Sequence, residues 1–144
     1  MPRHILVVED NASLRSLIVD VLSNEADLLV DAAGTITEAK ALLACPDACY
    51  DAILLDCGLP DGDGRDLCLQ LRRRGLRIPI LMLTGSVGEQ DRVDSLGYGA
   101  SDYLIKPVRI ADLLVRLRAQ LPALDGAAGA ALSLAARRLG GART

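Results

Sequence analysis

The chain has 144 residues, of which 51% are hydrophobic, and a formal net charge of −3, values that fit one domain with a packed core. The negative charge excludes attachment to nucleic acid or anionic membranes through bulk charge, and no stretch approaches the roughly 20 apolar residues of a membrane span. Because no signal-peptide pattern follows Met1, we expect a cytoplasmic protein with no membrane contact.

Five short apolar runs are predicted to be strands. Each is rich in aliphatic or β-branched residues and is bounded by polar or turn-forming residues, which is the pattern of a buried strand. In chain order, the runs are Ile5–Val8, Leu28–Val30, Ala52–Leu55, Ile78–Leu83 and Tyr103–Ile105.

Amphipathic stretches between these runs are predicted to be helices. Asn11 can cap the first, which ends before Asp27, because apolar residues recur after it at helical spacing. Either Thr35 or Thr37 opens the second, which ends before Pro46. The remaining predicted helices are Arg65–Arg74, Glu89–Leu96 and Ile110–Leu121.

This alternation predicts an α/β fold. Parallel strands need crossover connections, so strands that alternate with helices indicate a doubly wound parallel sheet covered on both faces. In such sheets the ligand crevice lies outside the carboxyl ends of the strands, and we expect function there. Residues 1–121 are predicted to form this domain, whereas residues 122–144 are rich in Ala and Gly and are predicted to be a linker or tail at the start of a missing effector domain.

Polar side chains follow four of the predicted strands. Glu9 and Asp10 follow the first strand and Asp56 follows the third. Three converging carboxylates repel one another unless a hard cation such as Mg²⁺ takes their oxygens as ligands. Thr84 and Lys106 follow the last two strands, which adds a hydroxyl and an ammonium to the same edge. This set suits phosphoryl transfer to a carboxylate nucleophile.

The same residues resemble the receiver domain of two-component response regulators over about residues 3–121. The matching positions are the acidic pair Glu9-Asp10, Asp56 with Pro60 and Gly64 at four and eight residues beyond it, Thr84-Gly85, Gly99–Tyr103 and Lys106-Pro107. The resemblance implies a flavodoxin-like (βα)5 sheet with strand order 2-1-3-4-5. It also implies a cis peptide bond between Lys106 and Pro107.

The resemblance further implies a mechanism. A sensor histidine kinase would supply the phosphoryl group, Asp56 would accept it, and Thr84 and Lys106 would assist. Mg²⁺ would be bound by Asp10, Asp56 and the backbone carbonyl of Gly58, with Glu9 acting partly through water. The chain would catalyse its own phosphorylation and dephosphorylation and would have no other enzyme activity.

In the family, phosphorylation moves the hydroxyl at the position of Thr84, and the aromatic residue at the position of Tyr103 swings inward. The surface that would change comprises the predicted helix Glu89–Leu96, the strand Tyr103–Ile105 and the helix Ile110–Leu121. Its charged residues resemble those used by winged-helix, OmpR-type regulators for phosphorylation-dependent homodimers; they are Arg92, Asp102, Asp112, Arg116 and Arg118. DNA would be bound only through the missing effector domain.

Two alternatives stay open from the sequence. The chain could be a stand-alone receiver that relays a signal by protein contacts. An aspartate-nucleophile phosphatase of the haloacid dehalogenase type also combines Asp, Thr, Lys and Mg²⁺, but such enzymes need a second Asp two residues after the nucleophile, where this chain has Gly58.

Overall fold

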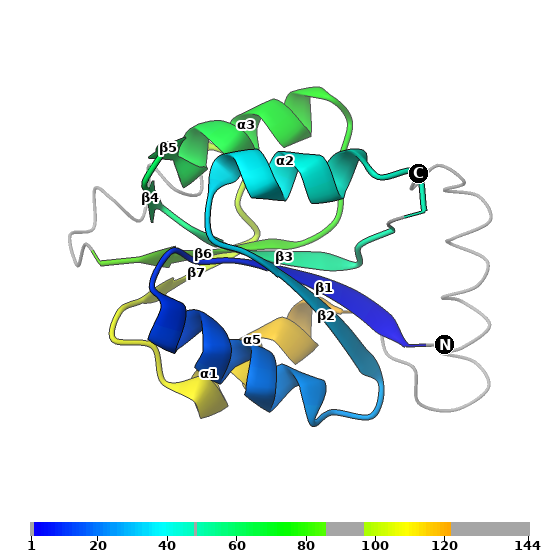
Figure 1. Ribbon diagram of the computed structural model, residues 1–144, viewed down its shortest axis with the longest axis vertical. Coiled ribbons are helices and arrows are strands. Elements are labelled where there is room, and N and C mark those ends of the chain that lie inside the picture. Colours follow the sequence, from blue (N-terminus) through cyan, green and yellow to red (C-terminus); the bar gives the residue numbers. More distant parts are fainter. Residues whose placement is uncertain (1, 48, 86–96, 122–144) are drawn as a thin grey trace.

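A five-stranded parallel sheet lies between two layers of helices (Figure 1) in the computed structural model, which describes residues 2–47, 49–85 and 97–121. Its strands are β1 (Arg3–Val8), β2 (Leu28–Ala33), β3 (Ala52–Asp56), β6 (Ile80–Thr84) and β7 (Asp102–Ile105), in the order β2-β1-β3-β6-β7. When only the five strands of this sheet are numbered along the chain, β6 and β7 are the fourth and fifth, and the order is the predicted 2-1-3-4-5. The doubly wound fold is therefore confirmed.

Two short strands in the turn-rich segment were not predicted. β4 (Gly58–Leu59) and β5 (Gly62–Asp63) pair antiparallel with each other and form a small separate ribbon. Each is two residues long, which is too short to show a period-two pattern in the sequence. The ribbon lies between β3 and α3, directly after the predicted acceptor Asp56.

The helices are α1 (Ala12–Ser23), α2 (Ile36–Ala44), α3 (Gly64–Arg73) and α5 (Ile110–Gln120). Figure 1 shows α1 and α5 on one face of the sheet and α2 and α3 on the other. The predicted helix Glu89–Leu96 and the predicted tail 122–144 lie outside the described residues. Within the described ranges, no helix has the length and apolar character required to cross a bilayer.

The two faces of the sheet build separate cores. Alternate strand residues point to opposite faces, so Ile5 and Val7 pack with Leu117 under α1 and α5, whereas Leu6 and Val8 pack under α2 and α3. All four strand residues are fully buried. The continuous apolar character of β1 in the sequence follows from burial on both faces.

Side-chain caps explain where the first two helices begin. The Asn11 side chain accepts a hydrogen bond from the Leu14 amide at 2.9 Å, as predicted. Thr35 caps α2, because its hydroxyl accepts from the Glu38 amide at 3.0 Å. The Glu38 carboxylate in turn accepts from the Thr35 hydroxyl at 3.2 Å and from the Gly34 amide at 3.3 Å. Thr37 instead donates its amide and hydroxyl to Asp61, at 2.9 and 2.8 Å.

Several predicted strand boundaries were wrong, including the start of β1, which lies at Arg3 and not at Ile5. β2 continues beyond Val30 to Ala33, because the polar Asp31 occupies this edge strand and accepts a 2.7 Å hydrogen bond from the Tyr50 hydroxyl. The predicted strand Ile78–Leu83 begins at Ile80 and ends at Thr84, since the amide-less Pro79 cannot donate to a ladder.

The charged residues predicted on the surface of β7 and α5 form ion pairs within the chain. Arg116 lies 3.0 Å from Asp102 and 3.5 Å from Asp112, between α5 and β7. Arg118 pairs instead with Glu25 at 2.8 Å and with Asp27, which precede β2. Its charge therefore ties α5 to the turn after α1.

Candidate functional site

The carboxyl edge of the sheet brings the predicted acids together. Glu9 and Asp10 directly follow β1, and Asp56 is the last residue of the neighbouring β3. One carboxylate oxygen from each lies within 4.8 Å of the others. Their convergence follows from the parallel register of the two central strands, because parallel strands end at the same edge.

Lys106 reaches this acidic cluster from the end of β7. Its ammonium nitrogen lies 2.7 Å from Glu9 Oε1 and 3.1 Å from Asp56 Oδ2. Its backbone amide donates to the Thr84 carbonyl at 2.7 Å, which aligns the last residues of β6 and β7. The predicted cis peptide bond between Lys106 and Pro107 is present.

Burial disfavours the charged forms of the carboxylates in this cluster. Glu9 is fully buried and Asp56 is 3% exposed. Burial first, and then the Glu9 carboxylate, raise the pKa of Asp56 from 3.8 to about 7, while Lys106 opposes the rise. With all groups ionised, three carboxylates and one ammonium leave two negative charges uncompensated. A hard divalent cation with oxygen ligands fits that balance.

Backbone contacts hold the acids in place. The second oxygen of Glu9 accepts from the Asn11 amide at 3.0 Å, and the Arg15 guanidinium donates to the Glu9 carbonyl at 2.8 Å. Asp56 Oδ1 accepts from the Gly58 amide at 3.2 Å. In both of these carboxylate contacts the donor is a backbone amide two residues further along the chain, in the loop after the strand. The loop backbone therefore orients the Glu9 and Asp56 carboxylates.

Gly64 sits against the backbone of Asp56. Its amide donates to the Cys57 carbonyl at 2.8 Å, and a Cβ at position 64 would lie 2.0 Å from the Asp56 carbonyl oxygen. No side chain fits there, because real Cβ atoms do not approach another atom closer than about 3 Å. The glycine therefore sets how α3 starts beside the acceptor strand.

Thr84 and Tyr103 lie on the neighbouring strands. Thr84, at the end of β6, is 5% exposed and borders the crevice. Tyr103 pairs in register with Met82 on β6 and packs, half-buried, against the core under α2 and α3. The two predicted switch residues are thus on adjacent strands, Thr84 at the site and Tyr103 in the core layer.

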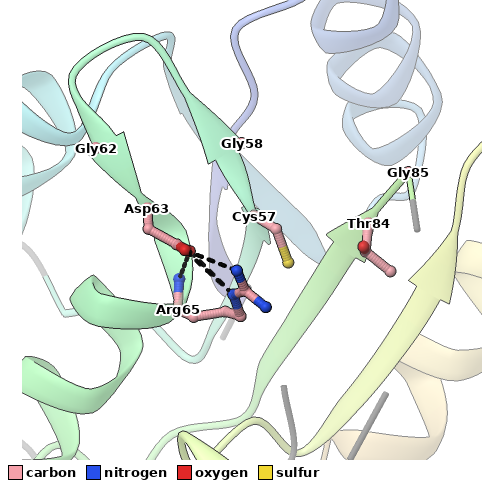
Figure 2. Close-up of a pocket in the computed structure, with 7 residues that line it drawn as sticks. All are labelled: Cys57, Gly58, Gly62, Asp63, Arg65, Thr84 and Gly85. Atoms are coloured by element: carbon pink, nitrogen blue, oxygen red, sulfur yellow. Dashed lines mark hydrogen bonds and ion pairs between the residues drawn. The ribbon is translucent and has the colours of Figure 1, made fainter. Parts of the chain in front are cut away.

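A hollow of about 380 Å³ opens between the segment that follows β3 and the end of β6 (Figure 2). It is lined by Cys57, Gly58, Gly62, Asp63, Arg65, Thr84 and Gly85. The sequence motifs include Gly58, Thr84 and Gly85 among these residues, whereas they place Arg65 only as the first residue of a predicted amphipathic helix. The available signal was its position two residues after a helix-capping acid, in the segment that follows the predicted acceptor.

The fold and site define an α/β domain of the flavodoxin-like class, with its polar groups at the carboxyl edge of a doubly wound sheet. The family model of the response regulator receiver domain matches residues 5–118. The chain belongs to this family, as the sequence motifs predicted. The aspartate-nucleophile phosphatase alternative is not favoured.

Known relatives include transcriptional regulators. The chain is 37% identical over 130 residues to the transcriptional regulatory protein PmrA of Pectobacterium parmentieri, covering 90% of this chain and 57% of that protein. It is 36% identical over 130 residues to the virulence transcriptional regulatory protein PhoP of Salmonella typhimurium, with the same coverage. The chain thus spans about half the length of the curated relatives it matches.

Solved receiver structures agree with the fold. The activated N-terminal receiver domain of Klebsiella pneumoniae RstA is 35% identical with a TM-score of 0.75, covering 84% of this chain and 100% of that one. The non-phosphorylated receiver domain of Leptospira biflexa HemR is 32% identical with a TM-score of 0.75, covering 86% and 98%.

Proposed function

We propose that this receiver domain accepts a phosphoryl group on Asp56 from the phosphohistidine of a sensor histidine kinase. A carboxylate oxygen of Asp56 attacks the phosphorus in line, so that a P–O bond forms while the P–N bond to the kinase histidine breaks. The observation that carries this proposal is the buried Asp56 carboxylate, 3.1 Å from Lys106, in a chain of the receiver family. The domain's only catalysis is its own phosphorylation and dephosphorylation.

Asp10, Asp56 and the backbone carbonyl of Gly58 would hold Mg²⁺, with Glu9 acting partly through water. The clustering of three carboxylate oxygens within 4.8 Å supports this assignment, because Mg²⁺ is bound by a few carboxylates together with water and phosphate. When bound, the ion supplies charge neutralisation on the phosphoryl oxygens. The protein's own residues orient Asp56 and exclude bulk water from it.

Lys106 and Thr84 would bind the transferred group. The Lys106 ammonium neutralises charge on a phosphoryl oxygen, and the Thr84 hydroxyl donates a hydrogen bond to another. As the Thr84 hydroxyl moves toward the phosphoryl group, the ring of Tyr103 would swing inward and act as the switch. The packing of Tyr103 against the core under α2 and α3 supports a ring that changes its burial with the state of the site.

We further propose that β7 and α5, with the segment predicted as helix Glu89–Leu96, form a phosphorylation-dependent homodimer. The exposed Ile105 and Val115, 40% and 66% accessible, lie on these elements, beside the ion pair of Arg116 with Asp102. Size-exclusion chromatography with light scattering should show a dimer only after phosphorylation, and Val115→Glu should keep the phosphorylated chain monomeric.

Output through DNA would need an effector domain. The named relatives are transcriptional regulators about twice as long as this chain's match, which supports a receiver that controls a winged-helix effector in a longer cytoplasmic regulator. In that arrangement residues 1–121 are the receiver and 122–144 begin the linker. The other arrangement is a stand-alone receiver that signals by protein contacts, and it predicts phosphorylation-dependent binding to a protein without any DNA-binding domain.

Intact-mass spectrometry after incubation with Mg²⁺ and acetyl phosphate tests the central proposal. Wild type should gain one phosphoryl group, whereas Asp56→Asn and wild type with EDTA should gain none. The matched control is Asp20→Asn on the exposed side of α1, which should be phosphorylated like wild type. An adduct that persists in Asp56→Asn would refute Asp56 as the acceptor.

A further inference from the structure

Arg65 is a cation at the hollow between the segment that follows β3 and the end of β6, and the phosphoacceptor assignment does not use it. It is the second residue of α3 and lines the hollow together with Cys57, Thr84 and Gly85. Figure 2 shows its guanidinium extending from the helix start into this space, on the side of Cys57. An arginine there places a permanent positive charge at the mouth of a site built for anions.

Asp63 holds this guanidinium by one edge. Its carboxylate accepts from Arg65 Nη2 at 2.8 Å and from Nε at 3.2 Å. The same carboxylate accepts from the Arg65 backbone amide at 2.8 Å as the cap of α3. The Asp63 carboxylate therefore holds the Arg65 side chain in a set direction.

The other edge of the guanidinium is available for a ligand. Among the residues that the structure describes, Arg65 Nη1 donates no hydrogen bond, and the acceptors of Nε and Nη2 are the two carboxylate oxygens of Asp63. A guanidinium has five N–H donors in a planar fork that matches the spacing of phosphate oxygens. Gly58 and Gly85 have no side chains to fill the hollow next to it.

Two residues that line the hollow connect it to Asp56. The Gly58 backbone amide donates to Asp56 Oδ1 at 3.2 Å, and Cys57 is the next residue in the chain after Asp56. A phosphoryl group transferred to Asp56 would enter the space between Gly58 and Thr84. We propose that Arg65 binds the phosphoryl oxygens at this mouth, both on an incoming small phosphodonor and on phosphorylated Asp56.

This inference rests on the function proposed above and adds a residue to it. Arg65 would lower the concentration of phosphodonor at which Asp56 is phosphorylated at half the maximal rate. It would also slow loss of the phosphoryl group from Asp56, since the guanidinium competes with water for hydrogen bonds to the phosphoryl oxygens. Asp63 would moderate both effects, because its negative charge offsets part of the positive charge of Arg65.

The test uses the full chain with Mg²⁺ and varied acetyl phosphate, following adduct formation at Asp56 by intact mass. Arg65→Gln should raise the acetyl phosphate concentration for half-maximal rate about tenfold, and Arg65→Lys should recover part of that loss. Asp63→Asn keeps the helix cap and removes the opposing charge, so it should lower that concentration. Arg73→Gln, at an exposed position of the same helix, is the control for total charge and should match wild type.

A second readout does not depend on turnover. Beryllofluoride, a phosphoryl mimic, can be titrated into each variant with Mg²⁺ while amide NMR signals around Asp56 are followed. Its apparent Kd should rise about tenfold in Arg65→Gln and not in Arg73→Gln. Circular dichroism verifies that each variant is folded before either assay.

The outcomes separate the two proposals. If wild type forms no adduct at Asp56, the proposed function fails and this inference falls with it. If wild type is phosphorylated but Arg65→Gln has the same concentration dependence and beryllofluoride affinity as Arg73→Gln, only the role of Arg65 is refuted. It is also refuted if Arg65→Gln and Asp63→Asn shift these values in the same direction.

Discussion

Substitution of Gly64 by alanine tests the close approach of α3 to the acceptor strand. The added Cβ would lie 2.0 Å from the Asp56 carbonyl oxygen, 3.0 Å from its carbonyl carbon and 3.3 Å from Cys57 Cα. All three atoms are backbone, so no rotamer change relieves the contact. The start of α3 must move by about 1 Å or more to restore an ordinary carbon–oxygen separation.

Two effects act in opposite directions. Alanine is favoured over glycine in a helix and in its effect on the unfolded chain by about 0.4–1 kcal/mol. Overpacking of a tight contact costs about 1–3 kcal/mol or more, and a backbone clash of this depth belongs at the upper end. We therefore expect Gly64→Ala to lower the free energy of unfolding by about 2 kcal/mol.

Urea unfolding followed by circular dichroism measures this change. With an m-value of about 1–3 kcal/mol/M, a loss of about 2 kcal/mol lowers the midpoint by roughly 1–2 M. The control is Gly97→Ala, where no more distant atom of the described residues lies within 4 Å of the added Cβ, and its midpoint should stay the same or rise slightly. A Gly64→Ala midpoint equal to or above that of wild type would refute the close approach described here.

Three further predictions concern charge. Between pH about 4 and 7 folded Asp56 keeps a proton that the unfolded chain has lost, because its pKa is raised from 3.8 to about 7; wild-type stability therefore falls as pH rises through this range. In EDTA, Asp56→Asn should exceed wild type by on the order of 3 kcal/mol in urea unfolding at about pH 8 and match it below about pH 4. A hundredfold excess of Mg²⁺ over its Kd should stabilise wild type by about 2.7 kcal/mol in the same assay, and Asp10→Asn by clearly less; equal gains would contradict the ligand assignment. Arg72, half-buried, donates to the carbonyls of Gly99, Leu76 and Ile78 and to Ser101, so Arg72→Leu should lose about 2–3 kcal/mol in thermal or urea unfolding, whereas the exposed Arg73→Leu should stay within about 0.5 kcal/mol.

Local sequence was enough to predict the sheet and its acids. Parallel strands that are buried on both faces, such as β1 and β3, show in the sequence as short apolar runs. The first polar residue after each run marks the carboxyl end of the strand. The sequence alone therefore predicts that Glu9 and Asp56 lie at one edge of the sheet. Asn11 was assigned as a cap for a similar reason, because a capping side chain bonds to an amide only three residues away.

Contacts between distant segments were decided by the tertiary structure. Arg118 reaches Glu25 and Asp27, more than 90 residues earlier, because packing of α1 and α5 on one face of the sheet brings their ends together. The sequence did not predict these partners of Arg118, since helical periodicity indicates which residues share a face and not which segment that face meets.

The site shows the same division at shorter range. The sequence alone determined which residue types stand at the strand ends, and so the chemistry available to Asp56. Only the folded chain decided that Gly64 touches the Asp56 backbone and that Arg65, held by Asp63, lines the hollow. The physical reason is that strand ends are a property of local periodicity, whereas the walls of a hollow depend on how a ribbon, a helix start and two strands meet in space.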